Sequence, residues 1–216
     1  RYSQAKSTSQ SMTQKGTVYF KISSYQYSEK HIMSKTGTIP FVGVGYDRNF
    51  KLLNRNLHFN IESQYGITKY NGSGVTGPDQ TIIIHTQLQR YWHKDNLVFS
   101  SGLGYRFLYD LWGDQTTSTG LPTYDRRSEY FFGSVGTKIK FTEGRSLFLE
   151  YKHLLQGKHT SYLNNATWSG RLRNKQPKGF GISALYRLNQ RKILELDYWH
   201  ISDSASDNQG LGFFEP

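Results

Sequence analysis

Residues 97–111, LVFSSGLGYRFLYDL, alternate between two chemically different sets of side chains. One set is apolar and aromatic, whereas the other is small and glycine-rich, with Arg106 and Asp110 as its charged members. A period of two predicts a single β-strand whose two faces meet different surroundings. Strands of soluble domains usually stop after about five or six residues, but a tilted strand needs roughly ten residues to cross a bilayer. The stretch therefore favours a membrane-spanning β-barrel.

The composition of the whole chain is compatible with a transmembrane barrel and excludes several other classes. Only 36% of the 216 residues are hydrophobic, and no run approaches the roughly 18 consecutive apolar residues of a transmembrane helix. A barrel tolerates this composition because half of each strand faces a polar interior. The chain has no cysteine, which excludes disulfide scaffolds, thiolate metal sites and cysteine nucleophiles.

Nine segments of the chain show this alternation. Residues 1–16 are polar and are expected to form a flexible N-terminal lead-in, and residues 17–216 are expected to form a single barrel domain. The predicted strands are 17–27, 39–46, 56–68, 81–92, 97–111, 127–141, 147–155, 179–188 and 193–201.

The connections between these strands alternate in length. Tight turns follow the second, fourth, sixth and eighth strands, and long polar loops at 28–38, 71–79, 110–125 and 156–177 follow the others. This pattern predicts an all-β, antiparallel up-and-down transmembrane β-barrel with turns at one end and long loops at the other, as in outer-membrane barrels. Nine strands would leave an unpaired edge in hydrocarbon. We therefore expect ten strands, within a range of eight to ten, the tenth following Pro216 in a longer precursor or lying in the lead-in.

The polar faces of the predicted strands carry charges of both signs. The interior of a barrel of this size is filled largely by side chains, and buried charges need partners. We therefore expect a mutually paired network in the lumen, with a narrow solute path as the alternative. The expected members are Lys21, Glu62, Arg106, Lys138, Lys140, Glu150, Lys152, Arg187, Glu195 and Asp197.

The net charge of +11 raises the question of an anionic partner. Many of the cations fall in predicted loops rather than on one stripe, which disfavours nucleic-acid binding. If the loops lie at an outer leaflet, their guanidinium groups can pair with lipopolysaccharide phosphates. The expected contacts are Arg126, Arg127, Arg171, Arg173 and Lys175.

No motif in the chain predicts a catalytic or metal site. His58 and His85 fall on polar faces of neighbouring strands, but no metal-ligand spacing occurs, so neither a metal nor a cofactor is expected. Neither GxSxG nor a P-loop is present. A hydrolase with rim residues near His200 is the third functional hypothesis, because Ser202, Asp203 and Asp207 follow it closely; no catalytic residue is assigned.

The segments GLGYRFLYDL, SLFLEYKHLLQGKHTSYLNN and LELDYWHISDS resemble those of small outer-membrane β-barrel proteins of Gram-negative bacteria. Most members of this group have no assigned activity. The resemblance implies the barrel fold and a location in the bacterial outer membrane, and it transfers no catalytic residues. The C-terminus departs from the pattern, since such barrels end in a strand with a terminal aromatic residue and this sequence ends in GLGFFEP.

These observations together predict an integral outer-membrane protein with a structural, adhesive or lipid-interacting role. Its expected partners are membrane lipid and lipopolysaccharide, with a protein partner considered at the loops or at the unpaired C-terminal edge. A narrow porin-like channel for small solutes is the second hypothesis. The rival fold is a soluble lipocalin-like barrel, in which the apolar face would point inward around a ligand.

Overall fold

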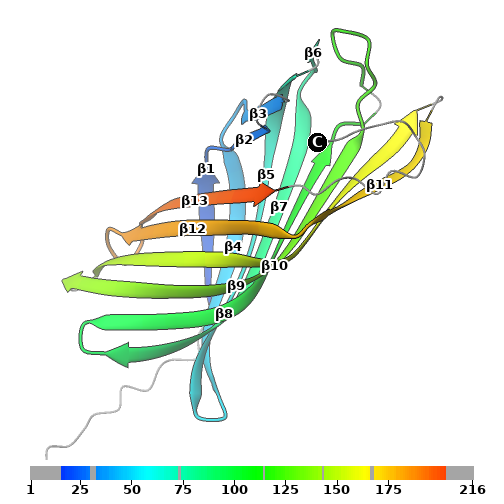
Figure 1. The fold of residues 1–216 in the computed structure, drawn as a ribbon. Coiled ribbons are helices and arrows are strands. Elements are labelled where there is room, and N and C mark those ends of the chain that lie inside the picture. Colours follow the sequence, from blue (N-terminus) through cyan, green and yellow to red (C-terminus); the bar gives the residue numbers. More distant parts are fainter. Residues whose placement is uncertain are drawn as a thin grey trace, which may run out of the picture.

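The computed structural model describes residues 16–29, 33–72, 74–113, 115–142, 144–165 and 168–202, in which the regular secondary structure consists of β-strands alone (Figure 1). No helix in this part of the chain is long and apolar enough to cross a membrane. The strands are β1 (Thr17–Ser23), β2 (Gln26–Glu29), β3 (Met33–Gly37), β4 (Phe41–Leu52), β5 (Arg55–Gly72), β6 (Gly74–Val75), β7 (Asp79–Lys94), β8 (Leu97–Leu111), β9 (Asp125–Thr142), β10 (Arg145–Asn165), β11 (Trp168–Gln176), β12 (Lys178–Arg187) and β13 (Ile193–Ser202).

Nine of these strands pair in series in the order β1-β4-β5-β7-β8-β9-β10-β12-β13, and each neighbouring pair is antiparallel. Each of the nine predicted strands overlaps one strand of this path, so the all-β antiparallel prediction is confirmed. The first, predicted at 17–27, is too long, because β1 ends at Ser23 and residues 26–27 belong to β2. The sheet curls into a half-barrel whose two free edges are β1 and β13 (Figure 1). The predicted tenth strand, and all of the lead-in except Gly16, lie outside the described residues.

Two of the segments predicted as loops form regular strands instead. The second half of β2 and all of β3, which pair with each other, lie within 28–38, and the second half of β10 pairs with β11 within 156–177. In β11 the side chains of Leu172, Asn174 and Gln176 are buried while the side chains between them are exposed. The period of two therefore persists, but polar residues occupy both faces. Hydropathy hides a strand of this kind, which is why the prediction of long loops was wrong there.

The two faces of the sheet meet opposite surroundings. The apolar set points away from the concave side, with Leu103 53% and Val135 57% exposed. The polar set points inward, where Glu150 and Gln89 are buried at 5% and 4% exposure. This orientation is the reverse of the lipocalin-like alternative, which requires the apolar face inside.

Inward-facing glycines make room for large side chains from neighbouring strands. A Cβ atom placed at Gly104 would lie 2.3 Å from the ring of Phe132, which is fully buried. A Cβ atom at Gly66 would lie 1.9 Å from Phe41 in the same manner. The glycine-rich face of residues 97–111 therefore packs against bulky partners in the interior.

Replacing Gly104 by alanine should lower the free energy of unfolding by about 1–3 kcal/mol, because Phe132 has to move. Urea unfolding followed by tryptophan fluorescence measures the change. The matched control is Gly133→Ala, where the new Cβ atom meets nothing closer than 3.8 Å, and we expect a change within about 0.5 kcal/mol. Equal losses in both variants would contradict the packing argument.

Candidate functional site

A first group of charges inside the half-barrel joins its first and last strands. Lys21 Nζ on β1 lies 3.0 Å from Glu62 Oε1 on β5 and 2.6 Å from Glu195 Oε2 on β13. Tyr19 and Gln64 also donate hydrogen bonds to the carboxylate of Glu62. The ion pair between Lys21 and Glu195 therefore connects the two free edges of the sheet, and Glu62 on β5 gives the same lysine a second carboxylate.

A second group of buried charged and polar side chains comes from the inner faces of β7, β10, β12 and β13. The amides of Gln87 and Gln89 each donate a 2.6 Å hydrogen bond to Glu150. Lys152 Nζ lies 2.9 Å from Asp197 and 3.8 Å from Glu150, with its side chain 3% exposed. Lys152 and the two carboxylates therefore compensate one another's charge, as burial in a low-dielectric interior requires.

The four remaining residues of the expected lumen network are not members of these ion pairs, although Arg106 shares the indole of Trp199 with Lys152. Arg106 lies over the indole of Trp199, 5.5 Å from the ring centroid, while the carboxylates of Glu62 and Glu150 are bonded to other groups. Lys140 and Arg187 lie directly opposite Ser146 on the two neighbouring strands, and Lys138 is two residues from Lys140. No ion pair involves these three cations within the described residues, so they form a positive cluster near the tight turns.

The described geometry does not assemble a hydrolytic centre. Lys152 donates to Ser183 Oγ at 2.6 Å, and Ser183 in turn donates to Asp197 at 2.6 Å, so the lysine offers no lone pair to the hydroxyl. Ser183 is also 1% exposed. The His200 ring lies tilted against that of Phe180 with 5.5 Å between ring centroids, and Ser202 donates to a main-chain oxygen. Asp203 and Asp207 lie outside the described residues.

A buried ion cluster lies at the loop end of the interior. Lys35 on β3 is 0% exposed, and its Nζ atom lies 2.7 Å from Asp79 Oδ2 and 2.6 Å from Asp110 Oδ1. Thr68 and Thr81 donate hydrogen bonds to these two carboxylates. Sequence reasoning missed Lys35 because it falls in a segment predicted as a loop. In the structure Met33 and Lys35 are buried and Ser34 between them is not, but this period of two pairs an apolar residue with a charged one, and hydropathy does not reveal it.

Arg126 belongs to the interior and not to the outer surface, so its expected contact with lipopolysaccharide is wrong. Its side chain is 5% exposed, lies near the rings of Tyr27 and Trp112, and donates from Nε to His159 Nε2 at 3.2 Å. Because Nε2 accepts this bond, the neutral imidazole carries its proton on Nδ1, which faces Ser128 at 2.9 Å. Burial and the Arg126 guanidinium hold the pKa of His159 well below its usual range.

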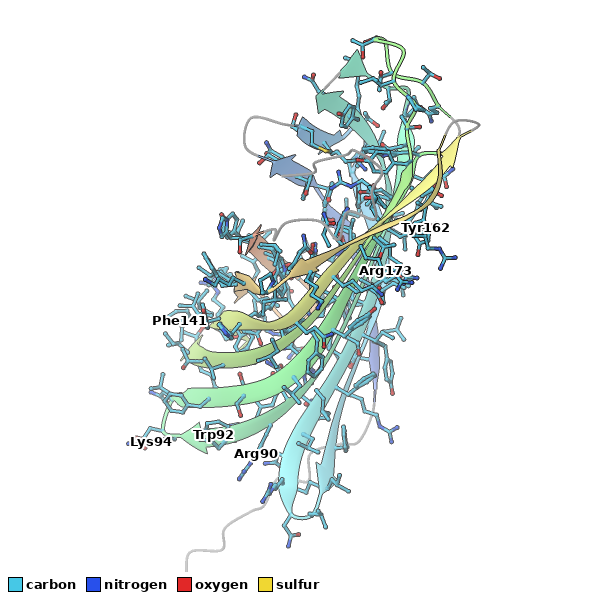
Figure 2. The ribbon with its side chains drawn as sticks, turned by 45° about the vertical axis from the view of Figure 1, so that its right-hand side comes forward. Arg90, Trp92, Lys94, Phe141, Tyr162 and Arg173 are labelled. Atoms are coloured by element: carbon cyan, nitrogen blue, oxygen red, sulfur yellow. The ribbon has the colours of Figure 1, made fainter. Side chains whose placement is uncertain are left out.

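The other predicted phosphate contacts lie on the outer face at the loop end, as Figure 2 shows for Arg173 beside Tyr162. Cross-strand pairing places Arg127 and Arg173 on either side of Thr160, and Lys158 beside Lys175. Five cations on this rim face two carboxylates, Glu129 and Asp125. The rim cations are Arg127, Lys158, Arg171, Arg173 and Lys175.

The histidines on the inner face have protein partners rather than a metal-binding arrangement. His58 Nε2 lies 3.3 Å from Asp47 Oδ1 and makes an edge contact with Tyr91. His85 lies against the ring of Phe132 at 5.4 Å. Within the described ranges, no group of three or more histidine, aspartate or glutamate side chains could hold a metal ion.

The Lys35 cluster should contribute strongly to stability. Lys35→Met leaves Asp79 and Asp110 buried without their cation, so we expect a loss of about 3–5 kcal/mol in the free energy of unfolding. The combined variant Lys35→Met, Asp79→Asn, Asp110→Asn should recover a large part of this loss. The control is Lys192→Met at an exposed turn. A Lys35→Met variant as stable as this control would contradict the role of the ion cluster.

His159 should make stability depend on pH. In the unfolded chain the imidazole takes up a proton below about pH 6.5, whereas in the folded protein it stays neutral. Stability is therefore complete above pH 6.5 and falls by up to about 1.4 kcal/mol per pH unit below it. Comparing urea midpoints between pH 7.5 and pH 5 should show a shallower decline for His159→Gln than for the wild type. His93→Gln, at an exposed position, should keep the wild-type slope; identical slopes in all three proteins would refute the assignment.

Comparison of the chain with protein-family models, with curated proteins and with solved structures finds no match. The function must therefore be argued from the geometry of this chain.

Proposed function

We propose that the protein is an integral β-barrel protein of the bacterial outer membrane with a structural, adhesive or lipid-interacting role. The observation that carries this proposal is the orientation of the sheet, whose apolar residues point outward and whose charged residues point inward. Exposed apolar side chains cover the outer face of strands from β1 to β13, whereas monomeric proteins in water rarely expose a contiguous apolar patch larger than a few hundred Å². In a bilayer the same surface is in contact with acyl chains.

The height of the apolar surface supports a bilayer as its environment. On β9 the outward residues remain uncharged from Phe131 to Phe141, a span of ten residue steps. At about 3.3 Å per residue and a strand tilt near 40°, this corresponds to about 25 Å, the height of the apolar band of outer-membrane barrels.

Aromatic residues lie at both limits of this band. Near the tight turns Trp92 stacks with Phe99, and Phe141 lies beside Tyr186 (Figure 2). Near the loops the ring of Phe107 lies beside that of Tyr109, and Tyr109 makes an edge contact with Tyr162 on β10. Two such belts are typical of the levels where a membrane protein crosses the headgroup regions.

The filled interior supports a structural or lipid-interacting role over a narrow pore. The Lys21 and Lys152 groups occupy the middle of the lumen, and the Lys35 cluster occupies its loop end.

The basic rim supports a phosphate-bearing lipid partner at the outer leaflet. Arg171, Arg173 and Lys175 alternate along β11 with their side chains exposed, and Arg127 lies in the row of Arg173. Guanidinium groups match phosphate oxygens geometrically, which suits the phosphates of lipopolysaccharide. For a protein partner, the available surfaces are the backbone N–H and C=O groups along the unpaired edge of β13 and the side chains at the loop end.

A single outward charge tests the membrane environment. Val135→Arg places a cation in the middle of the proposed band, where we expect a loss of about 2–4 kcal/mol in the folding free energy measured in phospholipid vesicles. Leu53→Arg, in the β4–β5 turn beyond the band, should change it by less than about 0.5 kcal/mol. Both side chains are exposed in the isolated protein, at 57% and 86%, so a soluble protein would tolerate both. Equal stability of the two variants, or a monomer that stays soluble without detergent, would overturn the proposal.

A further inference from the structure

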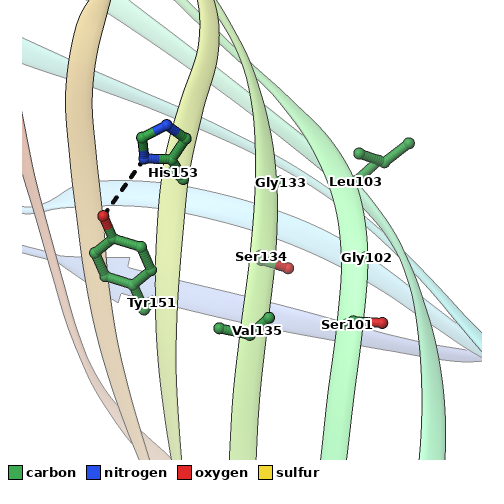
Figure 3. A pocket seen from close by; sticks show the side chains of 8 residues that line it. All are labelled: Ser101, Gly102, Leu103, Gly133, Ser134, Val135, Tyr151 and His153. Carbon is green, nitrogen blue, oxygen red and sulfur yellow. Dashed lines mark hydrogen bonds between the residues drawn. The ribbon is translucent and has the colours of Figure 1, made fainter.

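A depression of about 420 Å³ lies on the outer face of β8, β9 and β10 (Figure 3). Its lining residues are Ser101, Gly102, Leu103, Gly133, Ser134, Val135, Tyr151 and His153. Leu103, Gly133 and His153 form one cross-strand row, and Ser101, Val135 and Tyr151 form the next. The depression therefore lies within the apolar band that we propose to face acyl chains.

The depression exists because Gly133 has no side chain in the middle of its row. A Cβ atom placed there would meet only Leu155 at 3.8 Å and the carbonyl oxygen of Gly102 at 4.0 Å. This differs from the inward glycines, whose missing side chains are replaced by a neighbouring ring. The space above Gly133 is left open on the outer surface.

Polar groups line this space although its surroundings are apolar. Tyr151 Oη and His153 Nδ1 lie 3.5 Å apart, at the edge of hydrogen-bonding distance (Figure 3). Polar groups that face acyl chains lose their hydrogen bonds to water, which is unfavourable unless another partner replaces them. The contact between Tyr151 and His153 gives each of these groups a partner, so the rest of the depression can accommodate an acyl chain.

The basic rim lies beyond the depression toward the loop end, on β9, β10 and the neighbouring β11. The row of Glu129 and Lys158 is four residue steps from Gly133 along β9, or about 13 Å at the usual rise per residue. Arg127 and Arg173 lie one row further on. Glu129 is shared between Arg127 at 3.0 Å and Lys158 at 4.0 Å, so the rim keeps an excess of positive charge.

We propose that this depression and the rim beyond it form a binding site for one phosphate-bearing acyl lipid. The phosphate would lie at Lys158 and Arg173, and the acyl chain would extend from there toward the middle of the band, over Gly133 between Leu103 and Val135. This inference rests on the proposed membrane function and identifies the lipid chemistry that this part of the surface selects.

The experiment measures lipid retention by the full chain reconstituted in nanodiscs that contain equal amounts of phosphatidylglycerol and phosphatidylcholine with the same acyl chains. After extraction into detergent, native mass spectrometry counts the bound lipids. We expect one phosphatidylglycerol retained per wild-type chain. Gly133→Phe fills the depression and should reduce retention of both lipids about tenfold, since about two methylene groups lose their contact. Lys158→Gln with Arg173→Gln should remove the preference for the anionic lipid.

The matched controls test whether the effect belongs to this site. Ala184→Phe enlarges an outward residue on β12 that does not line the depression, and Lys192→Gln removes an exposed cation at the β12–β13 turn, away from the depression and the rim. Both should retain lipid as the wild type does. Gly133→Leu is a second filling variant, and protease protection confirms that each variant is inserted.

Wild-type retention in both filling variants, or an equal loss in Ala184→Phe, would overturn the inference and leave the membrane proposal standing. If the wild-type chain does not insert, both proposals fail together.

Discussion

Every strand of this sheet meets two different surroundings, and the most deeply buried carboxylates on the inner face can be tolerated only because they have charged or hydrogen-bonding partners. Glu150 is bonded to two glutamine amides, and Lys152 lies against Asp197. Removing one member of such a pair exposes the other to a low-dielectric interior with no compensating charge. The curl of the sheet, the inward glycines and the outward apolar surface are all compatible with this one requirement. The interior is therefore a rigid electrostatic core in the place where a soluble protein has a hydrophobic one.

The sequence reveals those parts of the fold in which one face is apolar. Residues 97–111 coincide with β8 because the side chains from Leu97 to Leu111 alternate between greasy and small. The second half of β10 and the whole of β11 escaped recognition because the strand continues there with polar residues on both faces. In that region the strands are held by backbone hydrogen bonds between β10 and β11, which a hydropathy pattern does not reveal. Sequence alternation thus predicts where the two surroundings differ, and not how far the sheet extends.

The candidate site was predictable to a similar degree. Lys21, Glu62 and Glu195 lie on predicted inner faces and meet in the structure, because side-chain parity places them there. Parity could not foresee that Arg106 would lie over Trp199, since that contact depends on the curvature that brings β13 across from β8. Arg126 and Arg127 are adjacent in sequence and lie on opposite faces. The sequence pattern places both at the end of the predicted loop 110–125, where no difference between them is expected. On β9 consecutive side chains must point to opposite faces.

The ion pair between Lys21 and Glu195 has a consequence for the order of folding. It joins residues 174 positions apart, whereas the strands of the nine-strand path pair mainly as consecutive hairpins. Hairpin contacts need only short loops to close, but a contact between the two ends of the sheet requires nearly the whole chain to be arranged first. The curl should therefore be completed last, after the hairpins have docked in sequence. Before the curl is complete, water can reach the charged groups of Lys21, Glu62 and Glu195. They lose most of this water only when the two ion pairs form.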